Sequence, residues 1–359
     1  MEFPPFPGGI GNHAYNLAYE LSKCGYNVDV LTEYRTRFIE PEIEFDFKQP
    51  FKIHRVKRFT FIYLTYLQRV TQSIYLVIVN KYDFIICSAK YPIWIGALLS
   101  FILGKKKLFS VVHGSEVLAG SSVIRFLTKI SLLRYKTIIA VSTYTKNLLL
   151  EQKGYKNIVV IPNGFREFYS SKIEKIKLKG NPVLITVGNV TKRKGQQNVI
   201  KALPTILNVF PEAHYHIVGL PTCYEEFFEL AKNLGVDSHV TFHGSVSSEN
   251  LPVILAQADI FLMLSERQPD GDVEGFGIAI LEANSLGIPA IGSINSGIMD
   301  AIKNNYSGIL VNPHNVHEIL QAIENILDQK KAYNQRAKSW SENFTWDRVI
   351  QQYITELGL

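Results

Sequence analysis

Short apolar runs that alternate with helical stretches constrain the fold of this chain most. After a helix at 12–24 and a run at 28–31, such runs recur at 84–87, 108–112, 138–141 and 158–161. Six more follow at 183–187, 215–218, 240–242, 260–264, 289–291 and 309–311. Continuous apolar runs separated by helices are typical of parallel strands buried on both faces. The sequence therefore predicts an α/β protein with two doubly wound domains.

The alternation stops once, and this break predicts the domain boundary. Residues 165–180 combine serines and lysines with few strongly apolar side chains, which is typical of a linker. We expect one domain over 1–170 and another over 181–342. A last amphipathic helix is predicted from Thr345 to the end of the chain, at 345–359.

Composition excludes several protein classes. The 359 residues are 47% apolar and 19% charged, too apolar for a disordered chain. The three cysteines, Cys24, Cys87 and Cys223, form no CxxC pair, and a reducing compartment is expected. The longest apolar run, 91–104, is shorter than the roughly 20 residues that span a bilayer. With no leader pattern at its start, the chain is expected to be cytoplasmic, soluble or peripheral on a membrane.

Charge is divided between the two halves. Residues 1–180 carry a net charge of +13 and residues 181–359 a net charge of −7. A basic half suggests an anionic partner, either an anionic membrane surface or nucleic acid. No RNA-binding motif is present, so nucleic acid is the weaker candidate. A basic surface without a dedicated partner remains the simplest alternative.

Two glycine-containing segments are candidate phosphate sites. The segment Gly8-Gly9-Ile10-Gly11 precedes the first helix, where backbone N–H groups favour anions. Residues 187–195 follow a buried strand and place Lys192, Arg193 and Lys194 at the start of a helix, which suits a diphosphate. Taken alone, the first segment is equally explained by a turn and the second by a solvated loop.

Residues 265–282 are the most informative segment. Glu274 and Glu282 flank a Gly-Phe-Gly turn, and a helix that starts near Phe276 would direct its N–H groups toward the carboxyl end of strand 260–264. Open α/β sheets bind ligands at that edge. Carboxylates there suit sugar and ribose hydroxyls. The alternative, that two glutamates at this spacing are only surface charge, holds if the pair stands alone.

These segments together resemble the retaining nucleotide-sugar glycosyltransferases of family 4. The motifs are GGIG (8–11), HGSE (113–116), Ser142, IPNG (161–164), VGNVTKRKG (187–195), HGSV (243–246), EGFGIAILE (274–282) and GIPAIG (287–292). The resemblance covers essentially the whole chain, and EGFGIAILE is its most specific part. It implies two Rossmann-like domains that face each other across a cleft (GT-B), with the acceptor on the first, the nucleotide sugar on the second, and the last helix packed back on the first.

The resemblance also implies an activity. It is the transfer of a hexosyl group from a UDP-sugar or GDP-mannose to a sugar or lipid-linked acceptor, in cell-surface glycan or glycolipid biosynthesis. A nucleotide-sugar epimerase or hydrolase, or an inactive nucleotide-sugar-binding protein, remains an alternative, because a fold does not fix its chemistry.

Roles for single residues follow from the matched motifs. Lys194, helped by Arg193, would neutralise the leaving diphosphate, and Glu274 and His113 would contact the donor sugar. These four are the candidate catalytic residues. Glu116 would shape the acceptor side.

The same resemblance assigns the donor-binding residues. Glu282 would hold the ribose, and Val246 would meet the base. The other candidates are Gly8, Gly9, Gly11, Asn163, Gly188, Gly275, Phe276, Gly277 and Ile278.

No cofactor or metal is expected. The pair Asp270 and Asp272 superficially matches a metal-binding DxD motif, but cationic side chains already offset the diphosphate charge. Two departures from the family pattern stand out. Asn189 replaces a common arginine, and the strand that should precede Phe3 is missing. Either the start of the chain is misassigned, or the first sheet lacks a central strand.

Overall fold

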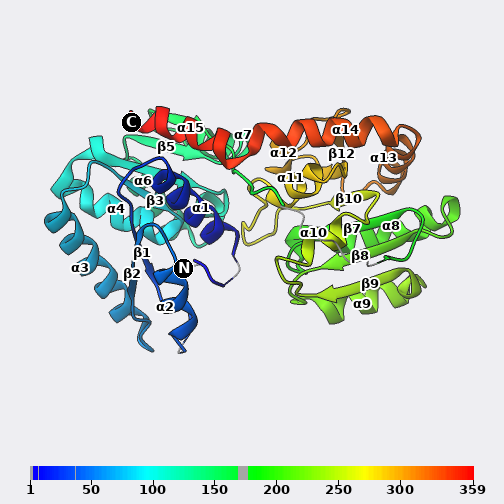
Figure 1. The fold of residues 1–359 in the computed structure, drawn as a ribbon, viewed down its shortest axis with the longest axis horizontal. Coiled ribbons are helices and arrows are strands. Elements are labelled where there is room, and N and C mark those ends of the chain that lie inside the picture. Colours follow the sequence, from blue (N-terminus) through cyan, green and yellow to red (C-terminus); the bar gives the residue numbers. More distant parts are fainter. Residues whose placement is uncertain (1–2, 7, 37, 169–176) are drawn as a thin grey trace. The chain divides into compact units, whose positions relative to one another are not determined.

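The computed structural model describes residues 3–6, 8–36, 38–168 and 177–359. The chain divides into two compact units (Figure 1). Unit 1 comprises Met1–Val141, Thr145–Gly164 and Trp346–Leu359, and unit 2 comprises Ser142–Tyr144 and Phe165–Thr345. Phe165, inside the predicted linker, is buried and pairs with Thr345, so unit 2 begins earlier than predicted. Residues 169–176 of that linker lie outside the described residues.

Unit 2 is built on one parallel six-stranded sheet with the order β12-β11-β10-β7-β8-β9. The strands are β7 (Val183–Val187), β8 (His214–Val218), β9 (Val240–Gly244), β10 (Ile260–Met263), β11 (Ala290–Ser293) and β12 (Gly308–Val311). All six predicted strands are confirmed. Every residue of β8 and β10 is buried, as expected for strands covered on both faces.

Helices that cover this sheet supply most of the core of unit 2. They are α8 (Gln196–Val209), α9 (Tyr224–Asn233), α10 (Leu251–Leu255), α11 (Ile278–Ser285), α12 (Ile298–Ala301), α13 (Val316–Asp328) and α14 (Lys330–Ser341). Apolar side chains of α8 and α13, such as Leu203 and Ile323, are fully buried against the strands. Asn315 caps α13, since its side chain accepts the N–H groups of His317 and Glu318.

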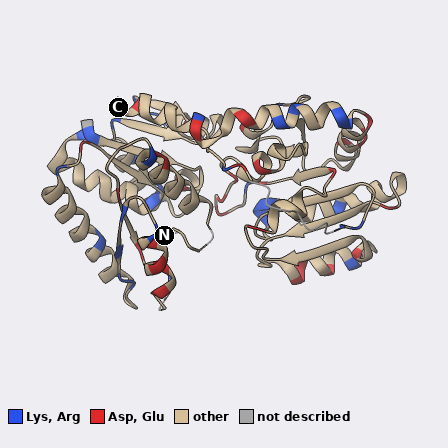
Figure 2. Ribbon diagram, viewed as in Figure 1, with Lys and Arg blue, Asp and Glu red and all other residues tan. Residues whose placement is uncertain are grey.

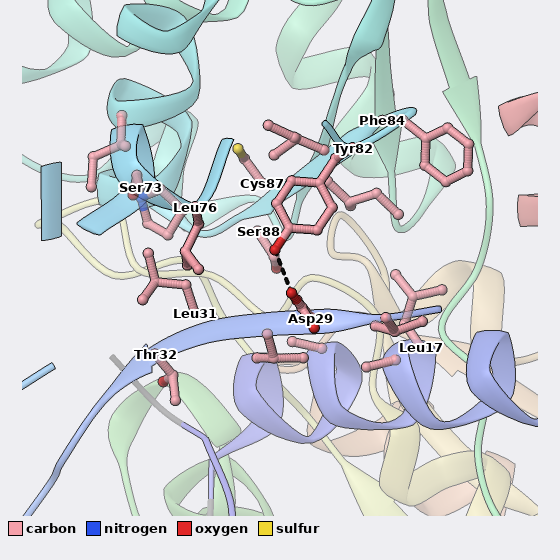
Figure 3. A pocket seen from close by; sticks show the side chains of 18 of the residues that line it. Leu17, Asp29, Leu31, Thr32, Ser73, Leu76, Tyr82, Phe84, Cys87 and Ser88 are labelled. Atoms are coloured by element: carbon pink, nitrogen blue, oxygen red, sulfur yellow. Dashed lines mark hydrogen bonds between the residues drawn. The ribbon is translucent and has the colours of Figure 1, made fainter. Parts of the chain in front are cut away.

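Unit 1 contains two parallel sheets instead of one. The larger has the order β3-β4-β5-β6, and the smaller pairs β1 with β2. The strands are β1 (Asp29–Glu33), β2 (Lys52–Val56), β3 (Ile85–Ser88), β4 (Leu108–Val112), β5 (Thr137–Ala140) and β6 (Ile158–Val160). A gap in the first sheet was expected, and among the described residues the strands are divided between β1 and β3, where a cavity of about 310 Å³ lies (Figure 3).

Strand β2 was not predicted, because its sequence alternates charged and apolar side chains. Arg55 of β2 is buried and forms ion pairs with Glu42 and Asp46 at 3.0 Å and 2.7 Å. Both acids lie on α2 (Glu40–Phe47), so this buried pairing fixes β2 against that helix. The charge of Arg55 suggests a surface position in the sequence, but its side chain is part of the interior.

The helices of unit 1 are α1 (Gly9–Lys23), α2 (Glu40–Phe47), α3 (Ile62–Asn80), α4 (Lys90–Leu103), α5 (Ser115–Leu118), α6 (Ser122–Leu132), α7 (Thr143–Glu151) and α15 (Trp346–Leu357). Helix α1 starts three residues earlier than predicted. Helix α15 packs on α1, where the Tyr353 hydroxyl lies 3.1 Å from His13 Nε2. Among the described residues, no helix is both long and apolar enough to cross a bilayer.

Candidate functional site

The strand order of unit 2 reverses at β7, and this reversal creates a candidate site. From β7 the chain builds β8 and β9 on one side, then crosses to build β10, β11 and β12 on the other. The loops after β7 and β10 therefore leave the sheet in opposite directions from neighbouring carboxyl ends. Open α/β sheets bind ligands at such a switch point.

Three of the predicted catalytic residues meet at this switch point. Lys194 and Arg193 come from the loop after β7, and Glu274 comes from the loop after β10. Lys194 Nζ lies 2.7 Å from Glu274 Oε2, and the Arg193 guanidinium forms an ion pair with the same oxygen. The Glu274 side chain is only 12% exposed. Residues 80 positions apart in the sequence thus form one buried charge cluster.

The charge state of Glu274 follows from these contacts. Burial raises the pKa of its carboxyl group, but Lys194 and Arg193 outweigh burial and lower the pKa to about 2. Glu274 is therefore ionised at any physiological pH. Lys194 and Arg193 are the two cations of the cluster that an anionic ligand would contact.

The loop that carries Lys194 is held rigidly by groups that the sequence analysis did not single out. Gly195 has φ +79°, and a Cβ at this position would lie 1.9 Å from the carbonyl oxygen of Leu264. Asn198 donates to that same oxygen at 3.1 Å, and Gln197 donates to the carbonyl of Lys192 at 2.9 Å. The sequence signal for this support is a run of three amide side chains, Gln196, Gln197 and Asn198, at the start of α8. All three are buried.

Helix α11 begins beside Glu274. Its first residue is Ile278, and Gly277 caps it with φ +89°, so the predicted start at Phe276 was two residues early. The N–H of Gly297 donates to the Glu274 carbonyl at 2.9 Å and fixes the turn that contains Gly275. The first N–H groups of a helix have no partner within it and form its positive end. An anion is favoured at this position.

Glu282 lies on the same helix in a different electrostatic environment. Burial raises its pKa from 4.5 to about 7, and the field of Lys194 offsets only part of this rise. Glu274 and Glu282 therefore differ strongly in charge near pH 6, although both are carboxylates of one motif. The difference arises because Lys194 and Arg193 contact Glu274 directly.

Of the other residues of unit 2 that the sequence singled out, Gly188 and Asp272 border the charge cluster, whereas Val246 lies further along the sheet. Gly188 directly follows β7, and the Lys194 side chain lies over it, since a Cβ there would be 3.1 Å from Lys194 Cε. Val246 follows β9, an edge strand two positions from β7. Asp272, weighed above as part of a metal motif, lies with its Oδ2 3.0 Å from Arg193 Nε. That carboxylate is thus a fourth member of the charge cluster.

Unit 1 brings a second group of predicted residues together. His113 follows β4, and its Nε2 lies 2.9 Å from the Ser88 hydroxyl at the end of β3. The ring of His13 from α1 lies edge-on to it, with centroids 5.1 Å apart. Burial lowers the pKa of His113 to about 4, so its imidazole is neutral at physiological pH. His13 was not predicted, because a single histidine on a helix carries no distinctive pattern.

Glu116 and Asn163 are buried and each keeps a free acceptor. Glu116 Oε2 accepts the backbone N–H of His113 at 3.0 Å, and this hydrogen bond stabilises the turn that contains His113. Within the described residues, Glu116 Oε1 and Asn163 Oδ1 are buried without a hydrogen-bond partner. Gly8 caps α1, whereas Gly9 and Gly11 lie inside its first turn instead of in a preceding loop.

The raised pKa of Glu282 predicts a pH-dependent stability. The unfolded chain loses this proton near pH 4.5 and the folded chain near pH 7, so the free energy of unfolding falls as pH rises between these values. Glu282→Gln removes the titrating group and with it this decrease in the free energy of unfolding. We expect the variant to be more stable than the parent by about 2 kcal/mol at pH 8 and nearly equal at pH 5. Urea unfolding at both pH values measures this, with Glu249→Gln on an exposed loop as control. An equal difference at both pH values would contradict the assignment.

Comparison with known families agrees with this geometry. The family model "Glycosyltransferase Family 4" matches residues 7–166, and "Glycosyl transferases group 1" matches residues 169–343. The chain is 28% identical over 284 residues to a GDP-mannose-dependent alpha-(1-6)-phosphatidylinositol monomannoside mannosyltransferase of Mycobacterium tuberculosis, covering 72% of this chain and 73% of the relative. It is also 28% identical over 263 residues to N-acetyl-alpha-D-glucosaminyl L-malate synthase of Bacillus anthracis, covering 69% and 67%.

Solved structures share the fold across the whole chain. The Anabaena protein Alr3699/HepE in complex with UDP-glucose aligns with a TM-score of 0.78 at 19% identity, covering 99% of this chain and 98% of that one. Sucrose-phosphate synthase from Thermosynechococcus elongatus aligns with a TM-score of 0.78 at 19% identity, covering 97% and 92%. The chain belongs to the group 1 glycosyltransferases of family 4, and it is a transferase with two Rossmann-like domains of the GT-B type.

Proposed function

We propose that this chain transfers a hexosyl group from a nucleotide-diphosphate sugar to a sugar or lipid-linked acceptor with retention of configuration. The observation that carries the proposal is the cluster of Lys194, Arg193 and Glu274 beside the start of α11. The name of one relative supports the donor and acceptor classes, since that protein is a GDP-mannose-dependent phosphatidylinositol monomannoside mannosyltransferase. A role in cell-surface glycan or glycolipid biosynthesis follows from such an acceptor.

Lys194 and Arg193 would stabilise the leaving diphosphate. Breaking the bond between the sugar and the diphosphate builds negative charge on the phosphate oxygens, and preorganised cations lower the barrier for this step. Glu274 holds both cations in place before the donor binds. The N–H groups at the start of α11 add a second source of positive electrostatic potential. Because these groups supply the positive charge, we propose that the reaction needs no metal.

Retention without a covalent intermediate fits this site best. Glu274 shares one oxygen with both cations, so it is better suited to hold the sugar and the cluster than to attack C1. We propose attack from the face that the diphosphate leaves, with a phosphate oxygen accepting the proton of the acceptor hydroxyl. A trapped glycosyl–enzyme adduct would contradict this mechanism.

Substitution of Lys194 tests the role of the cluster. We expect Lys194→Ala to lower kcat by about 10²–10³-fold, which corresponds to roughly 2–4 kcal/mol of lost transition-state stabilisation. Lys192→Ala is the matched control. Lys192 lies two residues away, is 53% exposed and pairs with Glu226 at the surface, so its loss should leave kcat within about twofold.

Both variants are compared by kcat and by circular dichroism. A near-normal kcat for Lys194→Ala, with the fold retained, would refute its role. An equal loss in both variants would show that the loop as a whole matters, and not the cation that contacts Glu274.

A donor panel tests the reaction class. UDP- and GDP-sugars are incubated with and without membrane lipid extract, in the presence of EDTA, and products are followed by mass spectrometry. We expect transfer from one donor only when the lipid acceptor is present, with no effect of EDTA. Release of free sugar or epimerised donor without acceptor would favour the epimerase or hydrolase alternative. Donor binding without any turnover would favour an inactive binding protein.

The acceptor side of the proposal includes contact with a membrane surface. Helices α3, α4 and α6 pack side by side in unit 1 and expose large apolar side chains. Phe101 on α4 is 75% exposed and Phe126 on α6 is 62% exposed. Others on these helices are Tyr63, Leu67, Tyr75, Ile78, Ile102 and Val123. An apolar patch of this extent typically marks an interaction surface.

The charge around these helices matches an anionic membrane. Residues 57–136 contain 12 lysines and arginines but only two acids, Asp83 and Glu116, and Glu116 is buried. In Figure 2 the acidic residues of the first part of the chain gather on α2, whereas α3, α4 and α6 carry none. Apolar side chains bordered by cations are typical of proteins that bind the interface of anionic membranes.

Liposome flotation tests this surface. We expect the chain to bind vesicles that contain anionic lipid and to be released by high salt, and the double variant Phe101→Ser/Phe126→Ser to bind at least about fivefold less. Phe47→Ser is the matched control, because Phe47 is 86% exposed but ends the acidic helix α2. Equal losses in both variants, or binding that high salt does not weaken, would contradict the proposed surface.

A further inference from the structure

The pair Asp270 and Asp272, in the loop between β10 and α11, has no role in the function proposed above. Asp270 Oδ1 accepts the backbone N–H of Asp272 at 3.0 Å. On the other side, the N–H of Gln268 donates to the carbonyl of Asp272 at 2.8 Å. Gly271, between the two acids, has φ +87°, a conformation that favours glycine. The backbone of Asp272 is therefore held by two hydrogen bonds in a tight turn.

The side chain of Asp272 contacts Arg193. Asp272 Oδ2 lies 3.0 Å from Arg193 Nε, and Glu274 pairs with Nη1 of the same guanidinium. An arginine side chain has many rotamers, but a planar guanidinium that is paired at two of its nitrogens has one orientation. Among the described residues, Arg193 Nη2 has no such partner. Its N–H groups therefore remain for a ligand, in an orientation that the two acids set.

The same loop also holds the backbone of Arg193. The N–H of Glu266 donates to the Arg193 carbonyl at 3.1 Å. Lys194, the neighbouring cation, pairs with Glu274 at 2.7 Å, and the described residues show no contact between Lys194 and Asp272. Asp272 thus acts on one cation of the cluster, whereas Glu274 acts on both. Removal of the Asp272 carboxylate leaves the contact between Lys194 and Glu274 in place.

Solvent exposure separates Asp272 from Glu274. The Asp272 side chain is 47% exposed, against 12% for Glu274. Water screens an exposed ion pair, so the contact with Arg193 adds little to the stability of the fold. The negative charge of Asp272 also does not attract an anionic ligand. What Asp272 contributes is therefore the geometry of Arg193.

We propose that Asp272 is a positioning residue for the transfer reaction. It holds the Arg193 guanidinium, before the donor binds, in the orientation that the leaving diphosphate requires. A cation that is already oriented lowers the barrier, because no reorganisation is needed while the bond to the diphosphate breaks. The inference rests on the proposed function, and in it Asp272 acts through Arg193 alone.

Kinetics of four chains test this role: the parent, Asp272→Ala, Arg193→Ala and the double variant. The donor is GDP-mannose or UDP-glucose, and the acceptor is membrane lipid extract. We expect Asp272→Ala to lower kcat about tenfold. Because the pair is exposed, the donor KM should stay within about twofold, and Tm within about 2 °C, of the parent values. In the Arg193→Ala chain the same substitution should cause no further loss of kcat, since Asp272 acts only through Arg193.

Two further variants serve as controls. Asp272→Asn keeps an oxygen that can accept the Arg193 Nε–H, so it should recover part of the lost kcat. Asp237→Ala removes an exposed acid before β9 and should leave kcat unchanged. It controls for the change in net charge.

Three results would overturn the inference. They are an unchanged kcat in Asp272→Ala, an equal loss of kcat in the parent and Arg193→Ala backgrounds, and a loss of activity that a lower Tm and a higher KM explain. All three are measured against a parent that transfers sugar. A parent without transfer activity would instead overturn the proposed function, and this inference with it.

Discussion

The pairing of parallel strands on both sides of one central strand is the constraint on which unit 2 depends. Because β7 is bonded to β8 and to β10, the loops that follow β7 and β10 start from adjacent points and diverge. Lys194 and Glu274 are brought within 2.7 Å by this arrangement, although they are far apart in the sequence. In unit 1 the described strands form two parallel sheets, and a cavity lies between β1 and β3. Strand order thus explains why the charge cluster forms in unit 2.

Contacts between opposite charges then set the ionisation state of the carboxylates near the cluster. Two cations on one carboxylate keep Glu274 ionised and hold the Lys194 and Arg193 side chains where an anion would need them. Glu282 is eight residues further along but lacks these direct contacts, so burial dominates and raises its pKa. In unit 1, burial acts alone on His113 and keeps it neutral. The charge states of Glu274, Glu282 and His113 are therefore set by the groups around each side chain and by its burial, and not by the residue type alone.

The apolar surface of α3, α4 and α6 was only partly visible in the sequence. The basic first half of the chain suggested an anionic partner, but not all of its cations lie at the surface, since the Arg55 side chain of β2 is buried with two acids. The exposed apolar side chains are spread over three helices, from Tyr63 and Leu67 on α3 to Phe101 on α4 and Phe126 on α6. Composition identified the basic half of the chain, whereas only solvent exposure separated surface residues from core residues.

Apart from β2, the sequence by itself determined the strand pattern of both units and the motifs that contain Lys194, Glu274 and His113. Buried strands and capped helices leave local signals, because each depends on residues a few positions apart. The tertiary structure decided the rest. The contact between Arg193 and Asp272, the pairing of His13 with His113 and the cavity between β1 and β3 all join distant segments. Such contacts depend on strand order and helix packing, and neither leaves a local pattern in the chain.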